Sequence, residues 1–260
     1  MGHRTFASSP TASRGQGTDQ RPAPIIAIDG PAGTGKSTIA LRLAKHFGWR
    51  YIDSGAMYRA VALCAAERGI PWTDEAALVR LCAQLTFTFA IREDQLVVCV
   101  DGRNVTQAIR RQAVGAGASQ VARLQGVRTI LVRKQQELGG AGGIVMDGRD
   151  IGTVVFPGAE VKFYLDATPE IRGRRRWLEL QQRGEPPSLL EVIEAIRRRD
   201  QDDRSRSVSP FRVVEDAYYI DTTNLAIDDV FELMVDKVKS FGVSFRSPDS
   251  RQGMGCPQST

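Results

Sequence analysis

The stretch that decides the fold is Gly30-Pro-Ala-Gly-Thr-Gly-Lys-Ser37, which matches the pattern GxxxxGK[ST] at every fixed position. An apolar run at residues 25–29 precedes it, and residues 36–47 carry apolar side chains at helical spacing. A strand, a glycine-rich turn and a helix in this order point successive backbone N–H groups into one concavity. The stretch therefore predicts a loop that holds the phosphates of a nucleotide.

The residue types in this loop also predict a metal. We expect Lys36 to reach the β- and γ-phosphates of ATP and the Ser37 hydroxyl to ligate Mg²⁺. The alternative is a glycine-rich turn before a helix that binds nothing. The candidate ATP-binding residues are Gly30, Pro31, Ala32, Gly33, Thr34, Gly35, Lys36, Ser37 and Thr38.

Five short apolar runs, each ending in Asp, alternate with segments of helical spacing. The runs predict strands at residues 25–29, 50–53, 143–147, 161–166 and 218–221. Helices are expected at 36–47, 56–68, 119–138, 169–183, 189–206 and 227–239. This alternation predicts an α/β fold with a five-stranded parallel sheet flanked by helices. Ligands bind at the carboxyl ends of such strands, where the Asp residues would collect.

The chain divides into one folded body and two tails. We expect a single domain at residues 24–240, with disordered tails at 1–23 and 241–260, and a transit function for the first tail stays open. Residues 85–91 and 95–100 flank a turn near Glu93-Asp94, and a second turn precedes residues 104–106. They predict a small antiparallel hairpin or three-stranded insert, in a subdomain at about residues 73–115.

Composition excludes several classes of protein. The chain has 260 residues, 42% hydrophobic and 25% charged, which suits a globular domain, and no apolar run is long enough to span a membrane. Its four cysteines show no CxxC spacing, so we expect reduced thiols in a cytoplasmic protein. With only two histidines, chemistry that relies on a histidine base is disfavoured.

Polar residues follow the second and third strands. Ser54 opens a helix and Arg59 lies about one turn into it, so both could face an anion; an ordinary helix cap with a solvated arginine is the alternative. Asp147, Arg149 and Asp150 come at the end of a buried strand, where charges are costly unless used. Asp147 is placed to assist Mg²⁺, directly or through water. A turn with a structural ion pair would explain the same residues.

Arginines cluster on two predicted helices joined by Gly184-Glu-Pro-Pro187. Such a hairpin, at about residues 168–207, suits a lid that closes over phosphates and excludes water. A solvated face or a nucleic-acid patch would explain some of them, although interleaved Asp residues weaken the latter. The clustered residues are Arg172, Arg174, Arg175, Arg176, Arg197, Arg198, Arg199, Arg204 and Arg206.

Taken together, these segments resemble the bacterial-type cytidylate kinases, a family of P-loop nucleoside monophosphate kinases. The resemblance extends from about residue 25 to 239 and rests on IDGPAGTGKST, DSGAMYRA, ASQVA, VMDGRDIGTVVFP, FYLDA and RRRDQDDRSRSVSP. It implies transfer of the ATP γ-phosphoryl group to CMP or dCMP, with Mg²⁺. The insert resembles the family's monophosphate-binding domain, and the arginine-rich hairpin resembles its lid.

The resemblance also implies roles for individual residues. Ser54 and Arg59 would bind the monophosphate nucleotide; Ser119, Arg128 and Asp150 would recognise cytosine; Arg199 and Asp203 would hold the sugar. Arg149 and Arg206 would lie near the phosphates and act with Lys36 in catalysis, and Arg175 would contact ATP. We expect ATP and CMP or dCMP as partners, no nucleic acid, no membrane and, as is common in the family, a monomer. Another small-molecule P-loop kinase, of UMP or shikimate type, and a non-catalytic nucleotide- or nucleic-acid-binding module remain as alternatives.

Overall fold

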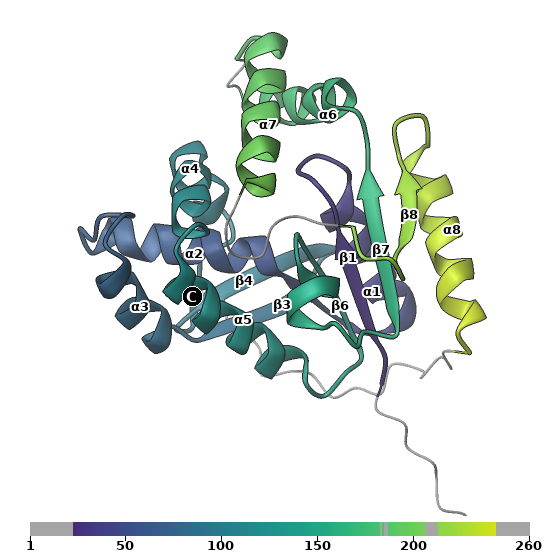
Figure 1. The fold of residues 1–260 in the computed structure, drawn as a ribbon, viewed down its shortest axis with the longest axis horizontal. Helices are drawn as coiled ribbons and strands as arrows, with labels where there is room; N and C mark the ends of the chain where they lie inside the picture. Colours follow the sequence, from purple (N-terminus) through teal and green to yellow (C-terminus); the bar gives the residue numbers. More distant parts are fainter. Residues whose placement is uncertain (1–22, 183, 185–186, 206–212, 243–260) are drawn as a thin grey trace, which may run out of the picture.

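The core of the molecule is a five-stranded parallel sheet with strand order β2-β6-β1-β7-β8 (Figure 1). The computed structural model describes residues 23–182, 184, 187–205 and 213–242. The strands are β1 (Ile25–Asp29), β2 (Arg50–Asp53), β6 (Ile144–Gly148), β7 (Val161–Asp166) and β8 (Tyr218–Asp221). The predicted fold class is confirmed. Four strands keep their predicted bounds, and β6 begins and ends one residue later than expected.

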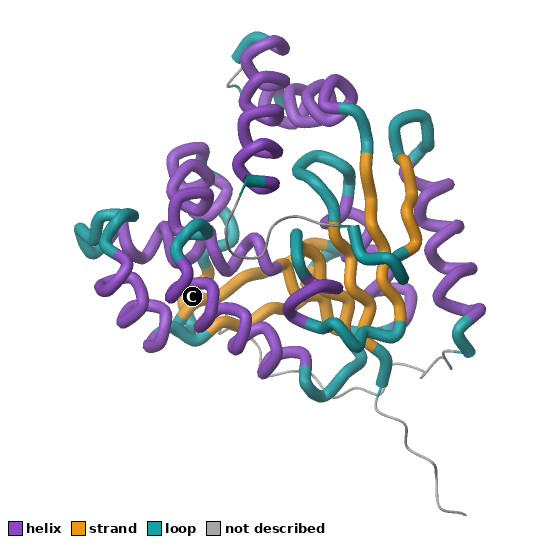
Figure 2. Tube along the Cα trace, viewed as in Figure 1, coloured by secondary structure: helices purple, strands orange, loops and turns teal. Residues whose placement is uncertain are grey.

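Side chains alternate along the central strand β1, so they pack on both faces of the sheet. Ile26 and Ile28 of β1 belong to the larger core cluster, together with buried residues of α1 (Lys36–Phe47) and α8 (Ile227–Ser240). Ala27, between them, belongs to a second cluster on the other face, with residues of η2 (Ile151–Val155). Helices therefore cover both faces of the sheet, as Figure 2 shows. Both α1 and α8 were predicted from their spacing.

The region between β2 and β6 contains a second sheet and four α-helices. Strands β3 (Phe87–Arg92), β4 (Gln95–Val100) and β5 (Arg103–Asn104) form an antiparallel sheet in that order, as the three-stranded alternative predicted. Only β4 keeps its predicted bounds; the other two strands were expected at 85–91 and 104–106. Glu93 and Asp94 have φ of 46° and 62°, so the turn between β3 and β4 is the left-handed type that fits a two-residue hairpin. The helices are α2 (Ser54–Glu67), α3 (Glu75–Gln84), α4 (Gln112–Val121) and α5 (Gln125–Gly139), with a 3₁₀ turn η1 (Ala108–Arg110).

In this region one helix was not predicted and one expectation was wrong. Helix α3 had not been predicted, although Asp74 caps it by accepting from Ala77 N at 2.9 Å. The single helix expected at 119–138 is two helices, because Leu124 is extended, with ψ of 120°. Arg128 Nη1 donates to Ala122 O at 3.3 Å and so satisfies a carbonyl at the end of α4. Gly126, in the first turn of α5, is the one glycine near this break, and the prediction of a single helix passed over it.

Helices α6 (Pro169–Gln181) and α7 (Leu189–Arg204) form a hairpin that projects beyond the carboxyl ends of the strands (Figure 1). Ser188 and Glu191 form a capping box that starts α7. Both helices end two residues before the predicted bounds, 183 and 206. The two predicted tails lie outside the described residues, except for residues 23, 241 and 242. Among the described helices none is long and apolar enough to cross a bilayer.

Candidate active site

The glycine-rich loop leaves β1 in a conformation that only glycine allows. Gly30 has φ of 148°, and a Cβ added there would lie 2.0 Å from Leu165 O on the adjacent strand β7. Thr34 Oγ1 donates to Pro31 O at 3.1 Å across the loop. Helix α1 then begins at Lys36, so its free N–H groups face the same concavity. The loop has the form that binds phosphate. Ser37 and Thr38, on the first turn of α1, are exposed.

Lys36 is buried at the centre of the site, where keeping its ammonium group charged and away from water is unfavourable. Its Nζ donates to Pro31 O at 2.6 Å. Burial, followed by the positive charge of Arg149, lowers the pKa of Lys36 from 10.5 to about 7, against the opposing effects of Asp147 and Asp29. Lys36 and Arg149 are thus two cations close enough to repel each other in a site largely removed from water. Anionic phosphate oxygens would offset that repulsion.

Asp147 lies beside the start of α1. Its Oδ2 accepts from Ser37 Oγ at 3.0 Å, and its Oδ1 accepts from Tyr51 Oη at 2.8 Å. Burial, followed by repulsion from Asp53, raises the pKa of Asp147 from 3.8 to about 7. A buried carboxylate and a hydroxyl at hydrogen-bond distance are the hard oxygen donors that Mg²⁺ prefers. The residues present fit the ion, and Tyr51, which the sequence had not indicated, orients the carboxylate.

Ser54 and Arg59 lie on α2, directly after β2. Ser54 is buried and its Oγ donates to Asp147 O at 2.7 Å, which joins the start of α2 to β6. Arg59 is half-buried, and its Nη1 donates to Ile109 O at 3.3 Å. Asp53 begins the helix by accepting from Ala56 N at 2.9 Å. The two predicted residues therefore share one helix whose first turn adjoins Asp147.

A buried ion pair joins α5 to the loop after β6. Arg128 Nη2 donates to Asp150 Oδ2, and the Arg128 guanidinium lies 5.8 Å from the ring centre of Tyr58. Only 4% of Arg128 and 7% of Asp150 is exposed. The buried Nε of Arg128 has no hydrogen-bond partner among the described residues. A buried guanidinium N–H without an acceptor is costly, so this pair is suited to receive a polar planar ligand.

Arg149 connects the same loop to α7. Its Nε donates to Asp203 Oδ2 at 2.9 Å, and its Nη1 donates to Gly148 O at 3.4 Å. Asp203 is almost fully buried, whereas Arg199, one turn earlier on α7, is half-buried. The structure thus places Arg199 and Asp203, two predicted acceptor-site residues of α7, near the carboxyl ends of the strands. Arg206, the remaining predicted arginine, lies outside the described residues.

Ser119 and Arg175 occupy opposite sides of the region. Ser119, half-buried on α4, donates to Gly115 O at 3.3 Å, as hydroxyls in helices commonly do. Arg175 Nη1 and Nη2 donate to Thr222 Oγ1 and O at 3.0 and 2.6 Å. Thr222 Oγ1 lies 3.3 Å from Thr34 O of the glycine-rich loop. Arg175 is therefore held beside that loop, on the side of β8.

Arg172, expected among the lid arginines, is instead buried under them. Its guanidinium donates to Ala167 O at 2.8 Å, to Ala32 O of the glycine-rich loop at 3.2 Å and to Asp200 Oδ2 at 2.6 Å. A Cβ on Gly33 would lie 3.1 Å from the Arg172 side chain. One arginine therefore ties α6, α7 and the loop together. The sequence pattern did not single out Arg172, because it is one of four arginines within five residues of the same helix.

Asp29, the last residue of β1, was seen in the sequence only as the end of a strand. Its Oδ1 and Oδ2 accept from the N–H groups of Ile151 and Gly152 at 2.8 and 2.7 Å. Burial raises the pKa of Asp29 from 3.8 to about 6, although both N–H groups act in the opposite direction. The loop after β6 is thus fastened to the strand that carries the glycine-rich loop.

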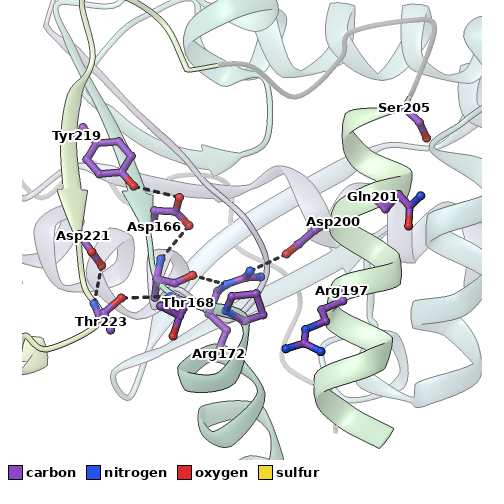
Figure 3. A pocket seen from close by; sticks show the side chains of 12 residues that line it. Asp166, Thr168, Arg172, Arg197, Asp200, Gln201, Ser205, Tyr219, Asp221 and Thr223 are labelled. Atoms are coloured by element: carbon purple, nitrogen blue, oxygen red, sulfur yellow. Dashed lines mark hydrogen bonds and ion pairs between the residues drawn. The ribbon is translucent and has the colours of Figure 1, made fainter. Parts of the chain in front are cut away.

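A cavity of about 700 Å³ lies beside this site, between α7 and the ends of β7 and β8 (Figure 3). Arg197 and Gln201 line it from α7, and Asp166 and Tyr219 line it from the strands. None of the predicted site residues lines it. Asp166 already accepts from Tyr219 Oη at 3.1 Å. Arg172 also lines the cavity, so the cavity adjoins the glycine-rich loop, although Lys36 and Asp147 do not line it.

The cysteines differ in part from expectation. Cys64 and Cys82 are buried free thiols, as predicted. Cys99 is disulfide-bonded, so the expectation of reduced thiols was wrong for this residue. No group of three or more His, Cys, Asp or Glu side chains is arranged to hold a metal within the described ranges.

Comparison with known proteins gives a consistent set of relatives. The family model for cytidylate kinase matches residues 26–240. A cytidylate kinase of Stutzerimonas stutzeri (strain A1501) is 46% identical over 220 residues, covering 84% of this chain and 96% of that protein. A cytidylate kinase of Geobacter sp. (strain M21) is 48% identical over 215 residues, covering 83% of this chain and 92% of that protein. The match spans almost the whole length of both relatives.

Proposed function

This chain belongs to the cytidylate kinase family, and we propose that it transfers the γ-phosphoryl group of ATP to CMP or dCMP. An oxygen of the acceptor phosphate attacks the γ-phosphorus, the bond to the β-phosphate oxygen breaks, and ADP leaves with CDP or dCDP as the second product. The acceptor oxygen is already anionic at neutral pH. No strong general base is needed, so positioning and charge neutralisation carry the catalysis.

The observation that carries the cytosine assignment is the buried pair of Arg128 and Asp150. Cytosine presents an N4 amino donor beside the N3 and O2 acceptors. Asp150 Oδ1 can accept from the N4 amine, while the Arg128 N–H groups and the Ser119 hydroxyl can donate to N3 and O2. The Arg128 Nε that lacks a partner in the described structure supports this reading. Uracil has an oxygen at position 4, which would face the Asp150 carboxylate unfavourably.

The phosphates of the two substrates would meet between the glycine-rich loop and the loop after β6. Lys36 and Arg149 supply positive charge there, and relief of their mutual repulsion favours binding of anions. Ser37 and Asp147 would hold Mg²⁺, directly or through water. When bound, the ion would neutralise charge on the β- and γ-phosphate oxygens. Ser54 and Arg59 would orient the acceptor phosphate, and Arg199 and Asp203 would hold its sugar.

Two parts of the fold would close around the substrates. We assign the small sheet of β3, β4 and β5, with its neighbouring helices, to the monophosphate-binding subdomain, and the hairpin of α6 and α7 to the lid. Arg206 and Arg175 would contact phosphate and ATP when the lid closes. Closure has to exclude water, because water would otherwise accept the phosphoryl group. A monomeric enzyme in the cytoplasm stays a prediction.

An acceptor panel tests the proposal. ADP formation from Mg-ATP is measured with CMP, dCMP, UMP, AMP, shikimate and no acceptor, for the wild type and a Lys36→Ala variant. We expect turnover with CMP and dCMP that the variant loses. Turnover only with another acceptor would refute the cytosine assignment. A folded protein that binds ATP but phosphorylates none of these acceptors would favour a binding module instead.

A further inference from the structure

We propose that Asp29 is a positioning residue that holds the base-reading loop, residues 149–152, in register with the glycine-rich loop, and thereby sets acceptor affinity and base discrimination. The proposal rests on the proposed function, because it concerns how that same site selects its acceptor. Asp29 touches neither the phosphates nor the base in the arrangement described above. It acts through the loop that carries Arg149 and Asp150.

The geometry places Asp29 at the junction of the two loops. It is the last residue of the central strand β1, and the glycine-rich loop starts at the next residue, Gly30. In the sheet Asp29 is in register with Gly148, the last residue of β6. Its backbone thus leads into the glycine-rich loop, while its side chain bonds to the loop after β6. A shift of either loop would change the position of Asp29.

The side chain satisfies its hydrogen bonds in a single way. Each carboxylate oxygen accepts one N–H, from Ile151 at 2.8 Å and from Gly152 at 2.7 Å, and the residue is 97% buried. A carboxylate accepts through both oxygens, whereas an amide presents one acceptor and one donor. Asn at this position would place its NH₂ group against one of the two N–H groups. The loop would then have to move to relieve that contact.

Such a movement would reach both functional side chains of the loop. Asp150 immediately precedes Ile151, and its side chain accepts from Arg128. Arg149 is one residue further back and contacts Asp203 of α7. Loss of the Asp29 contacts should therefore affect recognition of the acceptor base more than binding of ATP. The glycine-rich loop keeps its own support, since Lys36 and Arg172 bond to its carbonyls.

The first test is the Asp29→Asn variant, assayed with ATP, CMP and UMP as the varied substrates. We expect KM for CMP to rise at least roughly tenfold, the loss typical of an unsatisfied buried hydrogen-bonding group. The CMP-to-UMP ratio of kcat/KM should fall, while KM for ATP changes less than threefold. Equal changes in KM for CMP and ATP, or an unchanged CMP-to-UMP ratio, would overturn the proposal.

A second variant perturbs the same contact without changing charge. A Cβ on Gly152 would lie 3.3 Å from Asp29 Oδ2 and 3.2 Å from Lys162 Cδ, so Gly152→Ala crowds the contact from the other side. We expect a smaller rise in KM for CMP, at least threefold, with KM for ATP unchanged. This variant decides the question if Asp29→Asn fails to fold. An unchanged KM for CMP in Gly152→Ala would then count against the role.

Two further measurements separate positioning from general stability and from the proposed function. Val238→Ala, at a fully buried position of α8, lowers stability away from both loops and should leave the CMP-to-UMP ratio unchanged. Amide hydrogen exchange at residues 150–153 should speed up in Asp29→Asn and not in Val238→Ala. If the wild type does not phosphorylate CMP, the proposed function fails. Exchange that stays slow in Asp29→Asn overturns the positioning role by itself.

Discussion

Arg149 Nε donates to Asp203 Oδ2 over 2.9 Å, and this contact joins the loop after β6 to helix α7. The Asp203 side chain is only 4% exposed and that of Arg149 is 20% exposed. The contact therefore links the carboxyl end of β6 to the hairpin of α6 and α7, at a place that is largely shielded from water. It gives Arg149 a fixed direction, and among the described residues no hydrogen bond uses its Nη2 group, which can meet a ligand.

Replacing Arg149 by Ala should reduce turnover greatly and leave the fold intact. The variant loses a cation where charge develops during phosphoryl transfer, so kcat/KM for CMP should fall roughly 10²–10³-fold. Steady-state kinetics and circular dichroism check the two parts of this expectation. Arg133→Ala is the control, since Arg133 is an exposed arginine on α5 whose only described ion pair is with Glu137. Near-normal kcat/KM for CMP in Arg149→Ala would contradict the assignment.

Replacing Asp150 by Ala should remove the preference for cytosine over uracil. The variant loses the acceptor expected for the N4 amine and also a partner of Arg128. Because an unmatched polar group in a buried site costs about 1–3 kcal/mol, the CMP-to-UMP ratio of kcat/KM should fall by roughly ten- to a hundredfold. Asp94→Ala, at an exposed ion pair with Lys45, should leave the ratio unchanged. A ratio that Asp150→Ala does not alter would refute the base-reading role.

In the ligand-free protein, the stability of the wild type relative to a Lys36→Met variant should be greater at pH 9 than at pH 7. The folded pKa of Lys36 is lowered from 10.5 to about 7. Between these values the unfolded chain binds more protons than the folded one, so stability rises with pH over this window. Below pH 7 the full cost of the buried ammonium remains. Activity, by contrast, should be lost in the variant at every pH.

Thermal melts of wild type and Lys36→Met from pH 6.5 to 9.5 test this expectation. The difference in Tm between the two proteins isolates Lys36 from other titrating groups. Lys45→Met, on the exposed end of the same helix, is the matched control and should follow the wild type. A Tm difference that stays constant over the whole range would contradict the prediction.

Arg172→Ala should be strongly destabilising. Asp200 is buried and would lose its ion-pair partner, while its Oδ1 already lacks a hydrogen-bond partner in the part of the chain described. Breaking a buried pair from one side costs roughly 3–5 kcal/mol. Urea unfolding measures the loss. Arg176→Ala, which removes a surface pair with Glu179 on the same helix, should cost less than about 1 kcal/mol.

A double variant separates the buried charge from the packing. Arg172→Met with Asp200→Leu removes both charges and should recover part of the lost stability, since an apolar pair replaces an uncompensated carboxylate. If the double variant is less stable than Arg172→Ala alone, the ion pair is not the cause of the loss.

The sequence predicted those parts of the molecule whose signal is local. Strand bounds such as 25–29 and 161–166 followed from short apolar runs, and the glycine-rich loop followed from its spacing. Helix 119–138 was misjudged because its apolar spacing is helical on both sides of Leu124, whose extended backbone separates α4 from α5. Spacing alone does not show a one-residue change of backbone conformation.

The same limit applies to the site. Lys36, Ser37, Ser54 and Asp147 stand at strand ends or helix starts, and the structure brings them together as the topology requires. Tyr51, Arg172 and Asp29 were missed as site residues, because their partners are 96, 140 and 122 residues away in sequence. Aromatic or charged residues next to a glycine-rich loop are too common to single out. Which of these residues contact the site becomes clear only once the order of the paired strands is known.

The pairing of the central strand has a consequence for synthesis on the ribosome. Strand β1 is made early, yet its two neighbours in the sheet begin at residues 144 and 161. Until those segments leave the exit tunnel, β1 exposes both of its hydrogen-bonding edges and an apolar surface. The nascent chain thus passes through a long interval in which β1 has no strand to pair with. Rare codons or pauses before residue 144 would lengthen that interval, and they should lower the yield of folded protein more than pauses placed after residue 166.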